Sequence, residues 1–309
     1  MLTAAAVTSP VSLQGQPADT ALFAYFTGNG EDGLRLARSH DGLAWTPVAG
    51  GRSFLTPSVG SRLMRDPSIV QGPDGMFHLV WTTGWWDQGI AIAHSKDLVT
   101  WTPQEVLPVM AHEPTALNCW APEIFFDEPS GRYLVVWATT IPGRFPLTED
   151  SGNVHDGRQL NHRLYMTSTR DFRTWSPTRL FFDDGFNVID GVIVSLDGRH
   201  ALVVKDETQH PVPRKNLRVA FAAHAEGPYG AACEPFTPEW VEGPTALRFG
   251  DAWLIYYDEY ARKRYGAVRT RDFTTFENIS DRLQVPAGMR HGTAFNAPMS
   301  IAEGLHSRF

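Results

Sequence analysis

Four phrases along the chain each place an acid at the start of a predicted strand. Carboxyl groups held at unequal pKa values can act as a general base and a general acid. If the strands are repeats of one unit, the acids gather at one point, and such crowding is costly unless a substrate, a cation or a proton uses it. The phrases read Arg65-Asp66-Pro67-Ser68, Trp120-Ala121-Pro122-Glu123, Val188-Ile189-Asp190-Gly191 and Val241-Glu242-Gly243-Pro244.

A turn repeated along the chain indicates which elements hold those acids. Each copy follows a short apolar strand and contains an Asp, small or hydroxylated residues and a closing aromatic residue, which is typical of a β-turn. Radial repetition of small antiparallel sheets is typical of a β-propeller, and a degenerate copy brings the number of units to five. The copies occupy residues 39–45, 95–101, 168–175 and 270–276, and the degenerate copy occupies residues 222–229.

The sequence therefore predicts an all-β fold, a single five-bladed β-propeller over residues 1–309. The first blade lacks an inner strand, so we expect the C-terminal strand, residues 289–302, to close the ring by pairing into that blade. The innermost strand of each blade lines the central axis, so the acidic phrases are expected to meet there. The predicted blades cover residues 17–55, 60–112, 116–183, 186–235 and 239–285.

The composition agrees with one globular domain and argues against two classes of partner. The chain has 309 residues, 42% hydrophobic and 20% charged, with a formal net charge of −7. Nucleic-acid binding draws on clustered Lys and Arg, so no nucleic-acid partner is expected. No membrane partner is expected, because no run approaches the roughly 18 apolar residues of a spanning helix. Cys119 and Cys233 lack metal-binding spacing.

The first residues bear on location. Residues 1–16 carry no Lys or Arg, and their apolar stretch is interrupted by Thr8, Ser9 and Pro10. They make a poor signal peptide as written, so the cytoplasm is slightly favoured, with a secreted or periplasmic location if a leader has been removed. The sequence leaves the oligomeric state open.

The acidic phrases resemble the signature of glycoside hydrolase family 43 and its five-bladed relatives, over residues 65–293. By their motifs, the resemblance implies that Asp66 is the general base and Glu242 the general acid. Asp190 matches the residue that orients the acid and tunes its pKa, although Gly191 stands where the family usually has Pro. The implied partner is a carbohydrate substrate.

That set of acids suits inverting hydrolysis of a glycosidic bond. One carboxylate activates water and one carboxylic acid protonates the leaving oxygen, with the two groups about 6.5–9.5 Å apart. A negative Asp190 would raise the pKa of Glu242 by like-charge repulsion. Asp66, beside Arg65, is expected to stay ionised as a base must.

Other residues near the inner strands are candidates for binding substrate or metal. An indole face can stack on a sugar, and polar side chains can bond its hydroxyl groups. His291 would lie where the closing strand reaches the axis, and the resemblance implies a structural Ca²⁺ near such a histidine, while no cofactor is required. The alternative for His291 is a hydrogen-bonded core residue. The predicted substrate-binding residues are Arg65, Trp86, Trp120, Glu123, Phe186 and Arg290.

The favoured function is an exo-acting, inverting glycoside hydrolase that removes arabinofuranose, xylose or galactose units from plant-type oligosaccharides or polysaccharides. Residues 139–162 are too long for a hairpin and are expected to wall the pocket, which favours exo action. Two alternatives stay open: a propeller that binds glycans without turnover, and a fructosidase or phosphorylase of the related propeller clans. The sequence does not specify the sugar or the linkage.

Overall fold

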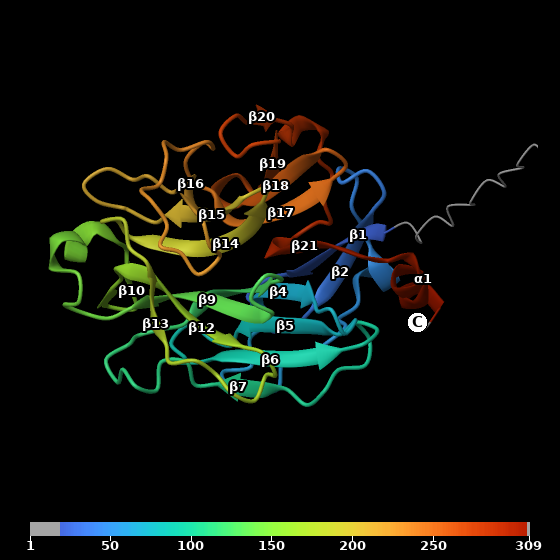
Figure 1. The fold of residues 1–309 in the computed structure, drawn as a ribbon, viewed down its shortest axis with the longest axis horizontal. Coiled ribbons are helices and arrows are strands. Elements are labelled where there is room, and N and C mark those ends of the chain that lie inside the picture. The colour runs from blue at the N-terminus through green and yellow to red at the C-terminus, as the bar shows by residue number, and fades with distance from the viewer. Residues whose placement is uncertain (1–18, 308–309) are drawn as a thin grey trace, which may run out of the picture.

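The computed structural model describes residues 19–307, whose strands form the five antiparallel blades of a β-propeller and one separate two-stranded hairpin (Figure 1). The all-β, five-bladed fold predicted from the turn repeat is confirmed. Within these residues no helix has the length and apolar character needed to span a membrane. Residues 1–16, from which a location was predicted, lie outside the described part of the chain.

In each blade the strands run outward from the axis and are joined antiparallel to their neighbours. Blade 1 contains β21 (Arg290–Pro298), β1 (Asp19–Phe26), β2 (Arg35–Ser39) and β3 (Thr46–Pro47). Blade 2 contains β4 (Arg65–Gln71), β5 (Phe77–Thr82), β6 (Ile90–Ser95) and β7 (Glu105–Leu107). Blade 3 contains β8 (Trp120–Asp127), β9 (Arg132–Thr140), β12 (His162–Thr169) and β13 (Arg179–Phe182).

The remaining two blades complete the ring. Blade 4 contains β14 (Val188–Leu196), β15 (Arg199–Asp206) and β16 (Asn216–Ala222). Blade 5 contains β17 (Glu242–Phe249), β18 (Ala252–Glu259), β19 (Arg264–Thr270) and β20 (Glu277–Asn278). The degenerate turn at residues 222–229 thus follows the third and last named strand of blade 4.

The ring closes as predicted, because β21 is the inner strand of the blade that begins with β1. The two strands pair antiparallel from Asp19 opposite Pro298 to Phe26 opposite Arg290. After Pro298 the chain forms a short helix, α1 (Met299–Ser307), in which Ala302 and Leu305 are buried. Both residues join the hydrophobic cluster between blades 1 and 2, so the C-terminal segment contributes to the core as well as to the closure.

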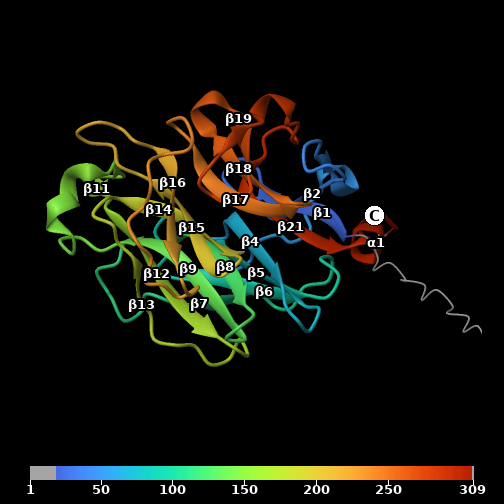
Figure 2. The ribbon, with the colours of Figure 1, turned by 45° about the horizontal axis from the view of Figure 1, so that its top comes forward.

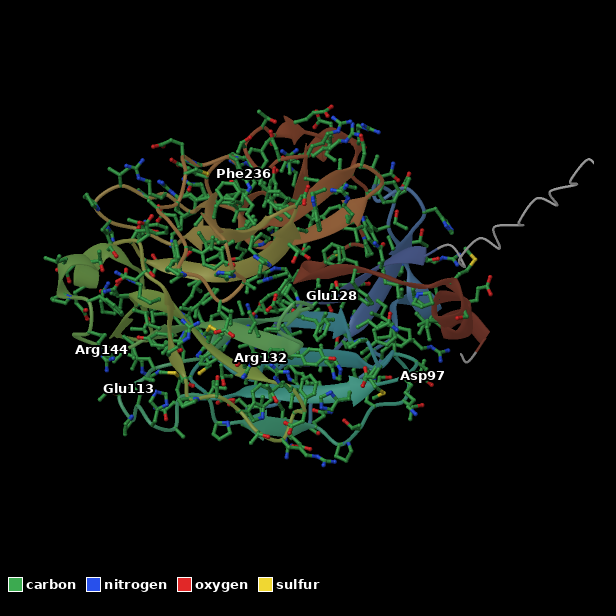
Figure 3. The ribbon with its side chains drawn as sticks, in the orientation of Figure 1. Asp97, Glu113, Glu128, Arg132, Arg144 and Phe236 are labelled. Carbon is green, nitrogen blue, oxygen red and sulfur yellow. The ribbon has the colours of Figure 1, made fainter. Side chains whose placement is uncertain are left out.

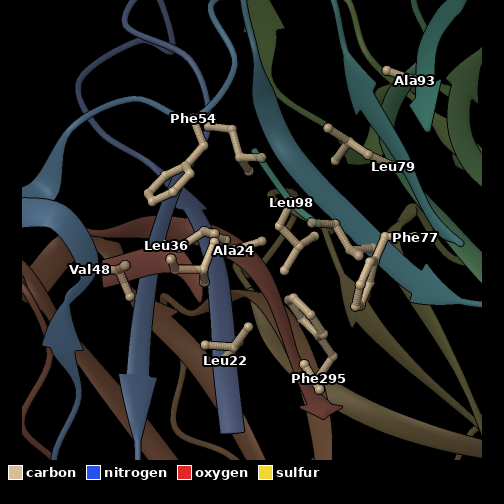
Figure 4. Close-up of a cluster of buried hydrophobic side chains, with 14 of the residues drawn as sticks. Leu22, Ala24, Leu36, Val48, Phe54, Phe77, Leu79, Ala93, Leu98 and Phe295 are labelled. Atoms are coloured by element: carbon tan, nitrogen blue, oxygen red, sulfur yellow. The ribbon is translucent and has the colours of Figure 1, made fainter. Parts of the chain in front are cut away.

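Apolar side chains between neighbouring blades form the core. Figure 4 shows one such cluster, in which Leu22 and Leu36 of blade 1 face Phe77 and Leu79 of blade 2, with Phe295 of the closing strand beside them. The rings of Phe77 and Phe295 meet edge to face at 6.1 Å between centroids. The closing strand thus pairs with β1 of blade 1 and packs against blade 2, which joins the last part of the chain to its first two blades.

The repeated turns are held by their acids. In the first turn, Oδ1 of Asp41 accepts hydrogen bonds from the backbone N–H groups of Leu43 and Ala44, both at 2.8 Å. The Ser39 hydroxyl accepts from the N–H of Gly42 at 2.9 Å. The residue after the acid of each turn has a positive φ, which Gly42 adopts without strain. The same pattern of acceptors recurs at Asp97, Asp171 and Asp272.

Candidate active site

The inner strands of four blades carry a β-bulge at the same point. In each, two residues of the inner strand face a single residue of the next strand, which bends the inner strand locally. Figure 2 shows the five inner strands β4, β8, β14, β17 and β21 meeting at the centre of the molecule. The bulges fall between Arg65 and Ser68, Trp120 and Glu123, Ile189 and Val192, and Glu242 and Thr245.

The first bulged residue of each pair has a left-handed backbone. The φ angles are 52° at Asp66, 47° at Ala121, 55° at Asp190 and 59° at Gly243. Asp adopts this region more readily than most residues, and Pro is tolerated at a bulge because the extra residue is not part of the ladder. This geometry explains the Asp66-Pro67 and Gly243-Pro244 phrases. In both, the first residue has the left-handed backbone of the bulge and the proline is the second bulged residue.

At Gly243 the space excludes any side chain. A Cβ atom there would lie 2.4 Å from Cγ of His291, closer than real Cβ contacts occur. The ring of His291, from the closing strand, therefore packs directly on the backbone of blade 5. The glycine brings the last strand into the centre of the site.

The bulges divide the inner-strand side chains into levels. The residues just before and at the bulges line a cavity of about 350 Å³ at one end of the axis. Glu123, two residues after its bulged residue Ala121, is outside the cavity lining and accepts a hydrogen bond from the Ser68 hydroxyl at 2.7 Å. The acids therefore stand at several levels instead of the single one expected: Asp66 and Asp190 at bulges, Glu242 one residue before, and Glu123 two residues beyond.

Asp66 is mostly buried, with 12% of its side chain exposed, and is held as an anion. Its Oδ2 accepts a hydrogen bond from the Thr82 hydroxyl at 3.0 Å, and its Oδ1 lies 3.3 Å from Nδ1 of His291. Burial alone would raise the pKa of Asp66, but the hydrogen bond and charge of His291, with Arg65 and Thr82, outweigh it and lower that pKa to about 2. The carboxylate is therefore ionised over the whole physiological range.

Asp190 has the opposite protonation behaviour. Its Oδ2 accepts the backbone N–H of Gly243 at 2.9 Å, which links the bulges of blades 4 and 5. Burial raises the pKa of Asp190 to about 6, because the lowering effects of His291 and Lys205 are countered by the charges of Glu242 and Asp66. Two acids at equivalent bulges thus differ by their surroundings.

Glu242 lies between two cations. Its Oε1 accepts from Nη2 of Arg290 at 2.8 Å, and its Oε2 accepts from Nζ of Lys205 at 3.3 Å. Each cation is shared with a second acid: Nε of Arg290 donates to Asp258 at 2.7 Å, and Nζ of Lys205 lies 2.6 Å from Glu207. The carboxylate is thereby fixed in position by an ion-pair network from three blades.

His291 connects the acids of this network. Burial would lower the pKa of His291, but Asp190, the hydrogen bond to Asp66 and the charge of Glu242 raise it to about 9. The imidazolium is therefore cationic near neutral pH, with Asp66 as its direct partner. Three carboxyl groups and one imidazolium thus stand together at the end of the axis.

Aromatic rings form another side of the cavity. Trp85 and Trp120 both line it, with their ring centroids 5.5 Å apart and nearly perpendicular. The guanidinium of Arg65 lies over the Trp85 ring, 4.5 Å from its centroid. Trp86 is next to this group, 6.2 Å from Trp120, and donates Nε1–H to Asp156 at 3.2 Å, but it is outside the cavity lining.

The connection between β9 and β12 walls the cavity. It contains the 3₁₀ helix η2 (Pro146–Ser151) and the hairpin β10 (Val154–His155) and β11 (Arg158–Gln159). Val154 and His155 line the cavity, and the ring of His155 lies 4.8 Å from Trp85. Arg144, earlier in this connection, forms an ion pair with Glu113, and Figure 3 shows the two side chains close together.

The structure thus brings together most of the predicted site residues. Phe186 instead packs edge to face on Phe182 at 6.3 Å between centroids, outside the cavity lining. Among the residues of the site that were not predicted are Glu207, Asp258 and Tyr260. The register offers a signal for one of them, because Asp258 pairs directly with Glu242 across blade 5. The predicted site residues that line the cavity are Asp66, Asp190, Glu242, Arg65, Trp120, Arg290 and His291.

The predicted calcium ion has no ligand set here. Within residues 19–307, no three His, Cys, Asp or Glu side chains are grouped so as to hold a metal ion. His291 is cationic beside Asp66, and a hard cation prefers several oxygen ligands. These residues do not fit a calcium site at His291.

Fold and cavity together define a five-bladed propeller with a carboxylate-lined site on its axis. Residues 16–300 match a family model related to glycoside hydrolase family 43 and described as a probable glycosyl hydrolase domain. The match covers most of the chain, so the protein belongs to this family.

Individual relatives are distant. An α-L-arabinofuranosidase of Bifidobacterium longum subsp. longum is 21% identical over 173 residues, which are 51% of this chain and 16% of that protein. The chain therefore spans about a sixth of that relative.

Solved structures share the fold at low identity. A Lactobacillus brevis α-L-arabinofuranosidase has a TM-score of 0.52 at 17% identity, covering 70% of this chain and 72% of its own. A family 117 glycoside hydrolase from Zobellia galactanivorans has a TM-score of 0.57 at 15% identity, covering 85% and 75%. At such identities these likenesses establish the architecture alone.

Proposed function

We propose that the protein is an exo-acting, inverting glycoside hydrolase that removes a terminal sugar from plant-type oligosaccharides or polysaccharides. Asp66 is the general base, Glu242 the general acid, and Asp190 the residue that tunes the acid. The observation that carries the proposal is the meeting of these three carboxyl groups, from blades 2, 5 and 4, in one cavity.

The environment of Asp66 supports its role as base. A base must be ionised when it takes a proton from water, and His291, Arg65 and Thr82 hold this carboxyl as an anion. Its φ of 52° is a conformation that the bulge imposes, and strained backbone of this kind clusters at functional sites. The attacking water would lie between Asp66 and the sugar.

The position of Glu242 supports its role as acid. It lines the same cavity as Asp66 and Asp190, and its charge is one of the causes that raise the pKa of Asp190. Inverting hydrolysis requires a second carboxyl group placed to protonate the leaving oxygen. Arg290 and Lys205 fix the orientation of Glu242, and their charges are already matched in part by Asp258 and Glu207.

The walls of the cavity support exo action on a single sugar. The hairpin at Val154 and His155 and the rings of Trp85 and Trp120 bound a space of about 350 Å³. Aromatic faces and a few convergent polar groups are typical of a site for one sugar unit. Arabinofuranose is the first candidate, since two similar proteins are arabinofuranosidases, with xylose and galactose next.

The test is hydrolysis of a panel of p-nitrophenyl glycosides by the wild-type protein. The panel contains α-L-arabinofuranoside, β-D-xyloside, β-D-galactoside and β-D-fructofuranoside. We expect release of p-nitrophenol from at least one of the first three, with proton NMR showing the inverted anomer as first product.

Other outcomes would identify the alternatives. Hydrolysis of the fructofuranoside alone would support a fructosidase, and turnover that depends on added phosphate would support a phosphorylase. No hydrolysis together with calorimetric binding of a sugar would support a glycan-binding propeller.

A further inference from the structure

A second cavity adjoins the first. It has a volume of about 940 Å³ and is formed by β18, β19, the 3₁₀ helix η4 (Ser280–Arg282) and the segment that leads into β21. Tyr260 and Arg290 line both cavities, so the two share a wall. The proposed hydrolysis in the first cavity assigns no role to this second cavity.

Arg290 is the side chain that joins the two spaces chemically. Its Nη2 donates to Glu242 in the first cavity at 2.8 Å, and its Nε donates to Asp258, which lines the second, at 2.7 Å. The second cavity therefore begins on the side of the proposed general acid. In hydrolysis of a glycosidic bond, the leaving group is the part of the substrate that lies against the acid.

The lining of the second cavity suits a saccharide. Leu283, Val285 and Met289 provide an apolar surface, while Lys263 and Asp281 are exposed and polar. A sugar combines apolar faces with hydroxyl groups, so it needs both kinds of contact.

A buried tyrosine lies in the wall of the second cavity. Tyr265 lines this cavity and is 5% exposed, and its hydroxyl has no hydrogen-bond partner among the described residues. Buried polar groups in folded proteins are rarely left unpaired, so a water or a sugar hydroxyl that came within reach would satisfy this group.

We infer that this second cavity binds the leaving-group side of the substrate, the oligosaccharide from which the terminal sugar is removed. The inference rests on the proposed function and adds a substrate class to it: a chain of at least two further sugar units beyond the scissile bond. Contacts in such a site are used to position the bond against Glu242.

The test compares a long and a short leaving group in a variant whose second cavity is filled. Ala287 is exposed and lines that cavity, so Ala287→Trp would occupy the space. The trisaccharides α-1,5-arabinotriose and β-1,4-xylotriose are compared with the matching p-nitrophenyl glycosides. We expect kcat/KM to fall at least tenfold more for the trisaccharide than for the aryl glycoside. Equal effects on both would overturn the inference.

Two further variants keep the result specific. Ala111 is exposed and outside both cavity linings, so Ala111→Trp is the matched control and should leave both substrates unaffected. Tyr265→Phe removes only the unpaired hydroxyl and should weaken use of the trisaccharide while the protein stays folded.

A failure of the proposed hydrolase function can be distinguished from a failure of the inferred saccharide site. If the wild type cleaves no aryl glycoside and no trisaccharide, the proposed function fails, and calorimetric binding of the two trisaccharides then decides the inference. Weaker binding by Ala287→Trp than by Ala111→Trp would support the second cavity as a saccharide site. Equal binding, or none by the wild type, would overturn it.

Discussion

Two sets of repeated acids occur in this propeller, and they differ in where their partners come from. The turn acids, such as Asp41 and Asp171, accept hydrogen bonds from backbone N–H groups two and three residues ahead. The axial acids have partners on other strands or blades: Thr82 for Asp66, Gly243 for Asp190, and Lys205 and Arg290 for Glu242.

The difference separates a structural device from a chemical one. At Asp41, Asp171 and Asp272, hydrogen bonds from backbone N–H groups lower the pKa of the carboxyl group. These three turn acids are therefore ionised for the same reason. On the axis, the pKa of Asp66 is lowered to about 2 and that of Asp190 is raised to about 6. Pairs of acids whose environments separate their pKa values are typical of acid–base catalysis.

The largest expected effect is on activity, at the proposed base. Asp66→Asn removes the carboxylate that would take a proton from water, so kcat on the responsive aryl glycoside should fall by about 10²- to 10⁴-fold. The matched control is Asp272→Asn in a turn, where the amide oxygen can still accept the backbone N–H groups. Equal activities of the two variants would contradict the division between the two sets of acids.

A smaller effect is expected on stability, at the packing of His291 on blade 5. Gly243 and Gly250 have nearly equal φ angles, 59° and 61°, but a Cβ atom meets His291 only at Gly243 and nothing at Gly250. In both Gly243→Ala and Gly250→Ala, the left-handed backbone should lower the unfolding free energy by about 1–2 kcal/mol. Urea unfolding should show Gly243→Ala less stable by a further ~1–3 kcal/mol; matching losses would refute the close contact.

The ion pair between His291 and Asp66 predicts a dependence of stability on pH. The folded pKa of His291 is raised to about 9 from an unfolded value of 6.5, so its contribution is complete below pH 6.5 and is lost as pH rises through 9. The unfolding free energy should therefore fall between pH 7 and 9 in the wild type by an amount on the order of 2 kcal/mol more than in His291→Gln. The exposed His40→Gln variant should follow the wild type.

The smallest effect is expected at a single turn. Asp171→Ala removes two backbone acceptor contacts at 2.8 and 2.9 Å and should lower the unfolding free energy by about 1 kcal/mol. The kcat of the folded protein should not change, because no residue of this turn lines the cavity. Asp197→Ala, at an exposed hairpin position, is the control and should cost less; a loss of kcat in Asp171→Ala would argue against a purely structural turn.

The sequence predicted the fold because its signals are local. The turn repeat depends on bonds within three residues, and the phrases around Asp66 and Glu242 match a bulge that forms within one strand. The levels of the acids were not predictable in this way. Strand alternation and bulge geometry place Glu123 outside the cavity lining. The repeat pattern of the sequence does not show how far each acid lies from its bulge.

The partners of the acids were harder to predict for a related reason. Glu207 lines the cavity and pairs with Lys205, and Asp258 is linked to the site by its register with Glu242 and its bond to Arg290. Such contacts depend on how the blades are packed around the ring. The aromatic residue Phe186 satisfied the sequence criterion for a sugar platform, yet it packs on Phe182 outside the cavity lining.

Proton donation by Glu242 to the leaving group is tested most sharply by the response of Glu242→Ala to leaving-group acidity. A 2,4-dinitrophenyl glycoside needs little protonation, whereas a phenyl glycoside of the same sugar needs a proton donor. We predict that Glu242→Ala retains kcat within about tenfold on the dinitrophenyl substrate and loses about 10²- to 10⁴-fold on the phenyl substrate. Equal losses on the two substrates would show that Glu242 is not the proton donor.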